Sequence, residues 1–281
     1  MKRVYLRRTN CLAIFGQKAD SQYWDQHWRT HNLRKFITSY KRNDFIMRPL
    51  RRYLPDEKGV VLEAGCGRAQ NVYCMKHNGY NAIGVDFAED TVRAVNEAVP
   101  ELDVRTCDIR DLPFKDGEVA GYWSLGVIEH YWSGYEEILD EMERVVRRTG
   151  FLFLSFPYMS PLRRLKVLLD RYETRYTQGD NDIFYEYCLD HRQVLNELAE
   201  RGFVLREKKP YDGIKGLKDE VSLFRPLLQQ IYDGKICKGK MSRKIVAFLN
   251  KMLELFCAHG ILFVMQRAPT MSEPGEANRL G

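Results

Sequence analysis

Residues 60–86 constrain the fold of this chain more than any other stretch. They open with three apolar residues, 60–62, which are typical of a short strand buried on both faces. Gly65 and Gly67 follow, and glycines at these positions let the backbone turn sharply and approach a ligand closely. A helix is then predicted over residues 69–78, and a second strand comes after it. The predicted unit is therefore strand, tight turn, helix and strand.

An acidic residue closes this unit. Asp86 ends the second strand, 19 residues after Gly67, where a carboxylate can accept hydrogen bonds from both hydroxyls of a ribose. The stretch therefore predicts a nucleoside-binding site. A nicotinamide dinucleotide is the rival ligand, but its fingerprint needs a third glycine where this chain has Gln70.

Composition bounds the class of protein. The chain has 281 residues, of which 44% are hydrophobic, so it can bury a sizeable core. A net charge of +6 is only mildly basic and does not indicate a nucleic-acid-binding protein. Seven scattered cysteines without a C-x-x-C pair indicate neither a disulfide framework nor a zinc site. We therefore expect a cytoplasmic protein.

Two apolar segments could suggest membrane targeting. Residues 11–15 are too short for the core of a signal peptide. Residues 245–265 are longer but contain charged side chains and Gly260, which argues against a continuous membrane span. We expect a helix, a turn and a strand there, and no transmembrane segment.

Strands and helices alternate along the rest of the chain. Further strands are predicted over residues 102–106, 119–124, 151–156, 203–209 and 261–266. Helices are predicted between them, over residues 89–99, 135–146, 162–172 and 190–201. This alternation predicts an α/β fold with a doubly wound parallel sheet covered on both faces.

The chain divides into a main domain and peripheral segments. We predict an N-terminal helical flap over residues 1–55, a main domain over 56–267, cap insertions at about 157–190 and 212–258, and a disordered tail over 268–281. The flap contains the aromatic pair Tyr23 and Trp24, which could cover a site. Alternatively, these aromatics only dock the segment onto the core, since buried rings supply apolar area anywhere.

Taken together, the motifs resemble those of the class I S-adenosylmethionine-dependent methyltransferases, in the type 11 and ubiquinone-menaquinone-methyltransferase-like group. Residues 63–67, Glu-Ala-Gly-Cys-Gly, resemble the first motif of that family, and Asp86 resembles its ribose-binding acid. Cys107-Asp108 resembles the adenine loop, and residues 124–130 resemble the end of the fourth strand. The resemblance covers residues 56–267 and departs from the family at Ala69, where a third glycine is usual.

The resemblance implies a fold, a cofactor and a reaction. The fold would be a Rossmann-like, seven-stranded sheet of order 3-2-1-4-5-7-6, with the last strand antiparallel and helical insertions forming a cap. The cofactor would be S-adenosyl-L-methionine. The reaction would transfer its methyl group by in-line displacement.

The same resemblance implies which residues hold the cofactor. Gly65 and Gly67 would contact it by their backbone, Glu63 would hold the ammonium end, and Asp108 would accept from the adenine amino group. Glu63 could instead cap the following turn, and Asp108 could be a simple turn carboxylate. The full set of predicted cofactor-binding residues is Glu63, Gly65, Cys66, Gly67, Asp86, Phe87, Cys107, Asp108, Ile109, Ser124 and Leu125.

Glu129 and His130 are the candidate catalytic residues. If the acceptor is a hydroxyl, His130 is the first candidate for a general base, because imidazole titrates near neutrality. Alternatively, this pair is structural. Some methyltransferases of this fold bind a metal through a Glu-x-x-Glu-His motif, but its first glutamate is Gly126 here, so we predict no metal.

The acceptor should be chosen by the flap and the cap insertions. Candidate residues of the substrate pocket are Tyr23, Trp24, Tyr158, Tyr185 and Tyr211. We expect methylation of a hydroxyl, amine or carbon of a small molecule or of a saccharide or lipid intermediate. RNA methylation and a non-catalytic cofactor-binding scaffold are the alternatives, although the chain shows no appended RNA-binding module.

Basic residues cluster in two stretches of the insertions, residues 162–171 and 234–244. They could contact anionic lipid or phosphate at the periphery. Alternatively, they are solvated faces of helices and loops. The sequence does not indicate an oligomeric state.

Overall fold

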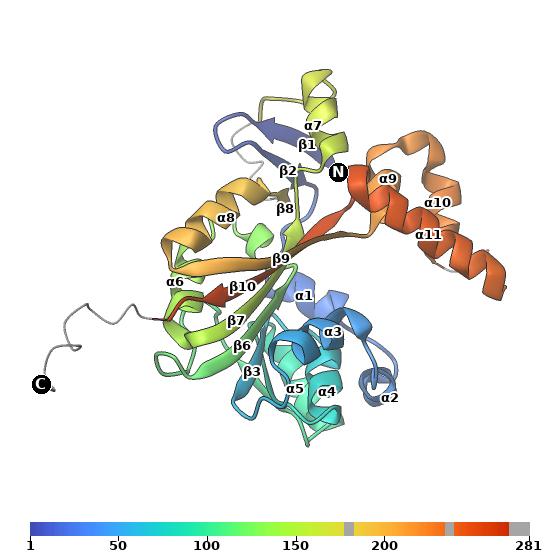
Figure 1. Ribbon diagram of the computed structural model, residues 1–281. Helices are drawn as coiled ribbons and strands as arrows, with labels where there is room; N and C mark the ends of the chain where they lie inside the picture. Colours follow the sequence, from blue (N-terminus) through green and yellow to red (C-terminus); the bar gives the residue numbers. More distant parts are fainter. Residues whose placement is uncertain (177–182, 234–238, 270–281) are drawn as a thin grey trace, which may run out of the picture.

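The computed structural model describes residues 1–176, 183–233 and 239–269. A seven-stranded sheet runs through its centre, in the order β5-β4-β3-β6-β7-β10-β9 (Figure 1). The strands are β3 (Val60–Ala64), β4 (Asn81–Asp86), β5 (Asp103–Thr106), β6 (Val119–Leu125), β7 (Val146–Pro157), β9 (Phe203–Tyr211) and β10 (Gly260–Arg267). Only β10 is antiparallel to its neighbours, β7 and β9. The predicted fold class and strand order are confirmed.

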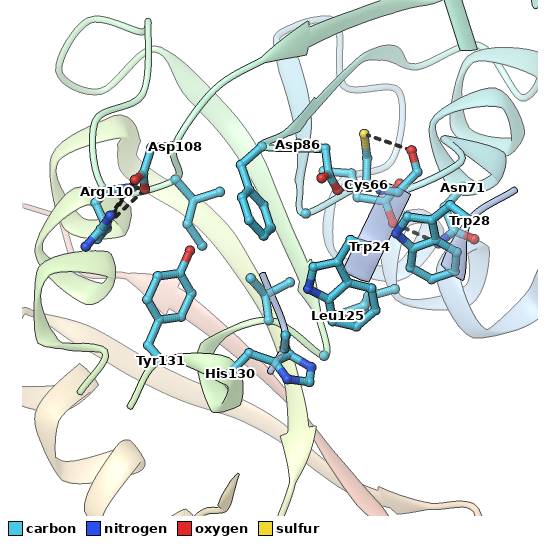
Figure 2. A pocket seen from close by; sticks show the side chains of 18 of the residues that line it. Trp24, Trp28, Cys66, Asn71, Asp86, Asp108, Arg110, Leu125, His130 and Tyr131 are labelled. Carbon is cyan, nitrogen blue, oxygen red and sulfur yellow. Dashed lines mark hydrogen bonds and ion pairs between the residues drawn. The ribbon is translucent and has the colours of Figure 1, made fainter. Parts of the chain in front are cut away.

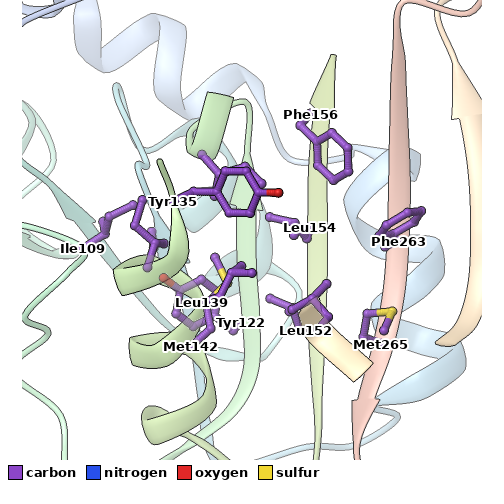
Figure 3. Close-up of a cluster of buried hydrophobic side chains, with 14 of the residues drawn as sticks. Ile109, Tyr122, Tyr135, Leu139, Met142, Leu152, Leu154, Phe156, Phe263 and Met265 are labelled. Atoms are coloured by element: carbon purple, nitrogen blue, oxygen red, sulfur yellow. The ribbon is translucent and has the colours of Figure 1, made fainter. Parts of the chain in front are cut away.

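Helices cover both faces of this sheet. One face carries α3 (Asp44–Tyr53), α4 (Gln70–His77) and α5 (Glu89–Ala98), whose apolar residues form one hydrophobic cluster with the sheet. The other carries α6 (Glu136–Val145) and α8 (His191–Glu200). Figure 3 shows Leu139 and Met142 of α6 against Tyr122, Leu152 and Leu154 of the sheet. Two apolar faces explain why the central strands read as nearly continuous hydrophobic runs.

The start of the chain corrects the prediction of a wholly helical flap. Strands β1 (Lys2–Leu6) and β2 (Cys11–Phe15) form an antiparallel hairpin, and β2 also pairs with β8 (Phe184–Cys188). All five residues of β2 are buried, so this short apolar run is a core strand rather than part of a helix. Helices begin only at α1 (Ser21–His27) and α2 (Leu33–Ser39).

The cap insertions contain most of the remaining elements. Helix α7 (Pro161–Leu168) ends earlier than the predicted residue 172. The second insertion contributes α9 (Gly213–Glu220), the short helix η3 (Ser222–Phe224), α10 (Arg225–Tyr232) and α11 (Lys240–Cys257). The predicted tail lies almost wholly outside the described residues. In the part of the chain that the structure describes, no helix is long and apolar enough to cross a bilayer.

A buried ion pair ties the cap together. Arg163 of α7 donates from Nε to Glu220 of α9 over 2.9 Å, and both residues are less than a tenth exposed. Arg3 of β1 and Lys166 of α7 also contact the Glu220 carboxylate. Burial alone would raise the pKa of Glu220, but these cations outweigh it and lower the pKa to about 2. The hairpin and both insertions therefore meet at one carboxylate.

Candidate cofactor and acceptor site

A cavity of about 410 Å³ lies where β3, β4 and β6 end. Figure 2 shows Asp108, Arg110 and Tyr131 at one end and Trp28 and Asn71 at the other. Of the residues predicted from the sequence, those that line it are Trp24, Glu63, Gly65, Cys66, Gly67, Asp86, Phe87, Asp108, Ile109, Leu125 and His130. The volume is near the lower end of small-molecule sites, which suits one nucleoside-sized ligand.

The turn after β3 requires its glycines. Gly65 has a φ of +79°, and a Cβ there would lie 2.4 Å from Cγ2 of Val127. Gly67 has a φ of +50°, and a Cβ there would lie 2.9 Å from the indole of Trp28. Ala69, which stands where the family has a third glycine, also adopts the left-handed conformation and caps α4, so the helix begins at Gln70.

Asp86 is held in place by the turn that it faces. Its Oδ2 accepts from the Gly67 amide over 2.7 Å, and its Oδ1 accepts from the Ala88 amide over 2.9 Å. Burial raises the pKa of this carboxyl. Each carboxylate oxygen has a second lone pair, so the group can still accept from a ribose diol.

Glu63 combines deep burial with an unused acceptor. Its Oε1 accepts from Nδ2 of Asn71 in the first turn of α4, over 2.7 Å. Its Oε2 is buried and has no hydrogen-bond partner among the described residues. Burial raises the pKa of Glu63 to about 8. The turn-capping alternative therefore accounts for one oxygen only, and a cationic ligand group would satisfy the other.

Asp108 is less available than the sequence suggested. Arg110 donates to it from Nε over 3.0 Å and from a terminal nitrogen over 2.6 Å, and the Arg110 amide donates to Oδ1. These bonds lower the pKa of Asp108. The turn-carboxylate alternative describes this arrangement, and an adenine amino group would have to share the carboxylate with Arg110.

Aromatic rings gather around His130. Its ring centroid lies 5.1 Å from that of Trp24 and 5.2 Å from that of Tyr185, and Tyr23 packs against Tyr185. The His130 Nδ1–H donates to the Tyr185 carbonyl over 2.6 Å, because a carbonyl can only accept. Burial lowers the pKa of His130 to about 4, so its imidazole is neutral at neutral pH. Its Nε2 keeps a lone pair.

The other predicted site residues do not line the cavity. Tyr158 is 4% exposed and packs in the core against His191, and the Tyr211 hydroxyl bonds Oγ of Ser155 over 3.2 Å. Tyr158 directly follows β7, in which residues 150–157 are all buried. The remaining residues outside the lining are Tyr23, Cys107, Ser124, Glu129 and Tyr185.

Some lining residues escaped the prediction. Trp28 lies one helical turn after Trp24, and this spacing could have identified it. Tyr131 follows His130 directly. Asn71 and Arg110 carry no pattern that distinguishes them from ordinary helix and turn residues.

The order of the sheet, its antiparallel strand, the glycine turn and Asp86 define a Rossmann-like methyltransferase fold. Residues 62–154 match the family model described as a methyltransferase domain. A probable S-adenosylmethionine-dependent methyltransferase of Mycolicibacterium smegmatis is 34% identical over 97 residues, which are 34% of this chain and 37% of that protein. One of Mycobacterium tuberculosis is 33% identical over 97 residues, which are 34% and 35% of the two chains. The chain thus spans about a third of these relatives.

Among solved structures, the chain is similar to a geranyl diphosphate C-methyltransferase from Streptomyces coelicolor, in complex with Mg²⁺, geranyl diphosphate and S-adenosyl-L-homocysteine. The TM-score is 0.53 at 13% identity, over 89% of this chain and all of the other, so the likeness shows the fold. The recognition is confirmed: this chain carries a class I S-adenosylmethionine-dependent methyltransferase domain, and S-adenosylmethionine is its cofactor.

Proposed function

We propose that this protein transfers the methyl group of S-adenosylmethionine to a hydroxyl, amine or carbon of a small-molecule, saccharide or lipid-intermediate acceptor. The observation that carries the proposal is the pair of buried carboxylates, Glu63 and Asp86, on either side of the glycine turn in one cavity. One suits a cationic amino-acid end and the other suits a ribose.

Each part of the cofactor has a candidate partner in the cavity. Gly65 and Gly67 leave the backbone open to it, Asp86 can accept from the ribose, and Glu63 can accept from the ammonium group. Phe87 is 41% exposed and offers a ring face to adenine. The bound cofactor supplies an electrophilic methyl group on a positively charged sulfur.

Displacement at that methyl group depends on alignment and on exclusion of water. Trp24 and Trp28 of the α1 region cover the cavity and would exclude water from it. His130 faces the same space with a neutral imidazole that can accept a hydrogen bond from the acceptor. Its low pKa makes it a weak base at neutral pH, so its proposed role is to orient the acceptor and receive its proton late.

The lining favours a small acceptor. The rings of Trp24 and Tyr131 line the cavity together with His130, and the ring of Tyr185 packs against His130 from outside the lining. Such a rim suits an apolar or saccharide body with one reactive group.

Calorimetry with S-adenosylmethionine tests the cofactor site. Asp86→Asn and Gly65→Arg should abolish binding, whereas Asp90→Asn, on the exposed start of α5, should preserve it. Failure of the wild-type chain to bind would overturn the proposal. A screen of extracts and candidate acceptors with methyl-labelled cofactor then identifies the acceptor, and labelling of RNA alone would contradict the small-molecule assignment.

A further inference from the structure

Glu129, His130 and Glu186 meet beside the cavity, and of the three His130 lines it. One ligand atom from each lies within 4.8 Å of those of the other two. Glu129 and His130 belong to the short helix η1 (Ile128–His130) after β6, whereas Glu186 lies in β8 opposite Ile14 of β2. Oxygen and nitrogen ligands of a divalent cation are roughly 3 to 4.5 Å apart at bond lengths of about 2.0–2.2 Å, so little adjustment is needed.

Lys215, Arg163 and Arg3 act on Glu186, and Lys215 also acts on Glu129, but none of them outweighs the burial of these two carboxylates. Glu129 is 2% exposed, and its buried Oε2 has no hydrogen-bond partner among the described residues. Burial, and then the charge of Glu186, raise the pKa of Glu129, and burial also raises the pKa of Glu186. Lys215 acts on both carboxylates, but its Nζ lies 2.6 Å from Nε2 of His259.

We propose that Glu129, His130 and Glu186 bind a divalent cation such as Mn²⁺ or Zn²⁺. Two carboxylates with one imidazole suit these ions better than Ca²⁺, which prefers oxygen ligands alone. The His130 Nδ1–H bond to the Tyr185 carbonyl is typical of a metal-binding histidine, because it fixes the tautomer and leaves Nε2 free. The fold thus supplies, through Glu186, a carboxylate in place of the one that Gly126 lacks.

The consequence for chemistry rests on the proposed function. Because His130 also lines the cofactor cavity, a cation there would hold an acceptor oxygen near the methyl group and make its proton more acidic. The lone pair on Nε2 of His130 would then be taken up by the cation, so the acceptor's proton would pass to solvent rather than to His130. Cation binding itself is independent of turnover, so the two proposals can fail separately.

Titration of chelator-treated protein with Mn²⁺, followed by electron paramagnetic resonance of the free ion, tests the site. We expect one ion per chain with a dissociation constant below about 100 μM, as for other carboxylate sites. Glu186→Gln should weaken binding at least tenfold and leave S-adenosylmethionine binding within twofold, and Glu200→Gln on α8 is the matched control. Absence of Mn²⁺ binding, or equal binding by Glu186→Gln, would overturn the proposal. Glu186 is only partly buried, so this variant should fold.

Helix α11 projects from the body of the protein (Figure 1). One face of the helix carries large apolar side chains that are 47% to 72% exposed, and we call them the α11 stripe. Its members are Met241, Ile245, Phe248, Leu249, Met252, Leu255 and Phe256. Spacings of three and four residues place them together. The opposite face packs on α9, where Asn250 accepts from the Ile214 amide.

The charges beside the stripe have one sign. Lys244 and Lys251 are exposed, and Lys251 forms an ion pair over 2.9 Å with Glu254, which is 8% exposed and also accepts from Asn250. Among the described side chains of α11, no acid reaches the exposed side. The net charge beside the stripe is therefore positive through Lys244, and like charges on two copies would repel each other, so the charge favours an anionic partner over a second copy.

We propose that the α11 stripe docks on an anionic lipid surface, with the helix lying in the plane of the interface. A helix with apolar side chains on one face and lysines at its edge is suited to this position. Such docking would bring the cap to acceptors that reside in or on a membrane.

Vesicle sedimentation with the full chain tests this proposal. We expect binding to phosphatidylcholine vesicles with about 30% phosphatidylglycerol, weaker binding to pure phosphatidylcholine, and a fall with salt. Phe248→Ser combined with Met252→Ser should weaken binding at least fivefold. Leu168→Ser, at an 80% exposed leucine of α7, is the control and should not. Two results would overturn the proposal. One is unchanged vesicle binding by the double variant, and the other is a dimer of the wild-type chain that the double variant no longer forms.

Discussion

The buried carboxyl of Glu63 should make the stability of this protein depend on pH in an unusual direction. Folding changes the pKa of this group from its ordinary value of 4.5 to about 8, because burial penalises the charged form. The folded chain therefore binds the proton more tightly than the unfolded chain does. The contribution of Glu63 to the free energy of unfolding should be fully present below pH 4.5 and should be lost as the pH rises through about 8.

The size of the effect follows from the two pKa values. One pKa unit corresponds to about 1.4 kcal/mol, so the free energy of unfolding should fall by about 3.5 kcal/mol between pH 5 and pH 8 from this group. Glu63→Gln removes the titration while keeping an oxygen for the Asn71 amide. The buried amide nitrogen that it introduces costs the same at both pH values, so it cancels in the comparison.

Urea unfolding of the cofactor-free protein at pH 5 and at pH 8 measures this change in the free energy of unfolding. The wild-type chain should lose stability over that interval by more than Glu63→Gln does, by about the amount derived above. Glu200→Gln should behave as the wild type. Equal pH dependence in the wild type and Glu63→Gln would refute the reasoning. At pH 7, binding of S-adenosylmethionine should also release a proton, seen by calorimetry in buffers of different ionisation enthalpy, and Glu63→Gln should lose this release.

Three further predictions concern other parts of the molecule. Glu220→Gln leaves the guanidinium of Arg163 without its buried partner, and the free energy of unfolding in urea should fall by about 3–5 kcal/mol; an unchanged value would mean that the ion pair does not hold the cap. Asp108→Asn should weaken cofactor binding less than tenfold in calorimetry, because Arg110 already occupies the carboxylate, and a larger loss would restore Asp108 as the main adenine contact. Gly67→Ala should weaken cofactor binding at least tenfold, because the new Cβ would press on the indole of Trp28. Adding Trp28→Ala should recover part of the binding. If it recovers none, the loss comes from backbone strain at the positive φ alone.

Local sequence determined the parts of the site that one βαβ unit builds. The glycine turn, Glu63 and Asp86 follow one another within residues 60–86, so their chemistry and approximate positions could be predicted. The strand order was predictable through the resemblance to the methyltransferase family, whereas the alternation of strands and helices by itself indicated only a parallel sheet covered on both faces. The apolar run that begins at Phe151 indicated a central strand, because a strand that is buried on both faces is apolar along its whole length.

Residues brought together from distant segments were not predictable. Glu186 lies close to Glu129 because β8 pairs with β2 and also packs against η1, where His130 bonds the Tyr185 carbonyl, and no sequence pattern links these segments. Residues 11–15 form an apolar run too short to distinguish a strand from a helix by periodicity. Tyr158 was assigned to the pocket from its place in a cap insertion, but the direction in which the chain leaves the sheet depends on packing that the sequence does not encode locally.

The pairing of β2 with β8 also sets an order of events during synthesis. Leu12 faces Cys188, so β2 leaves the ribosome roughly 170 residues before its partner, and closing so long a loop is slow. Until β8 is synthesised, the apolar face of the β1-β2 hairpin stays uncovered while the central sheet forms. The three-stranded sheet should be the last region of the chain to become protected from hydrogen exchange, and the acceptor end of the site should mature after the cofactor end.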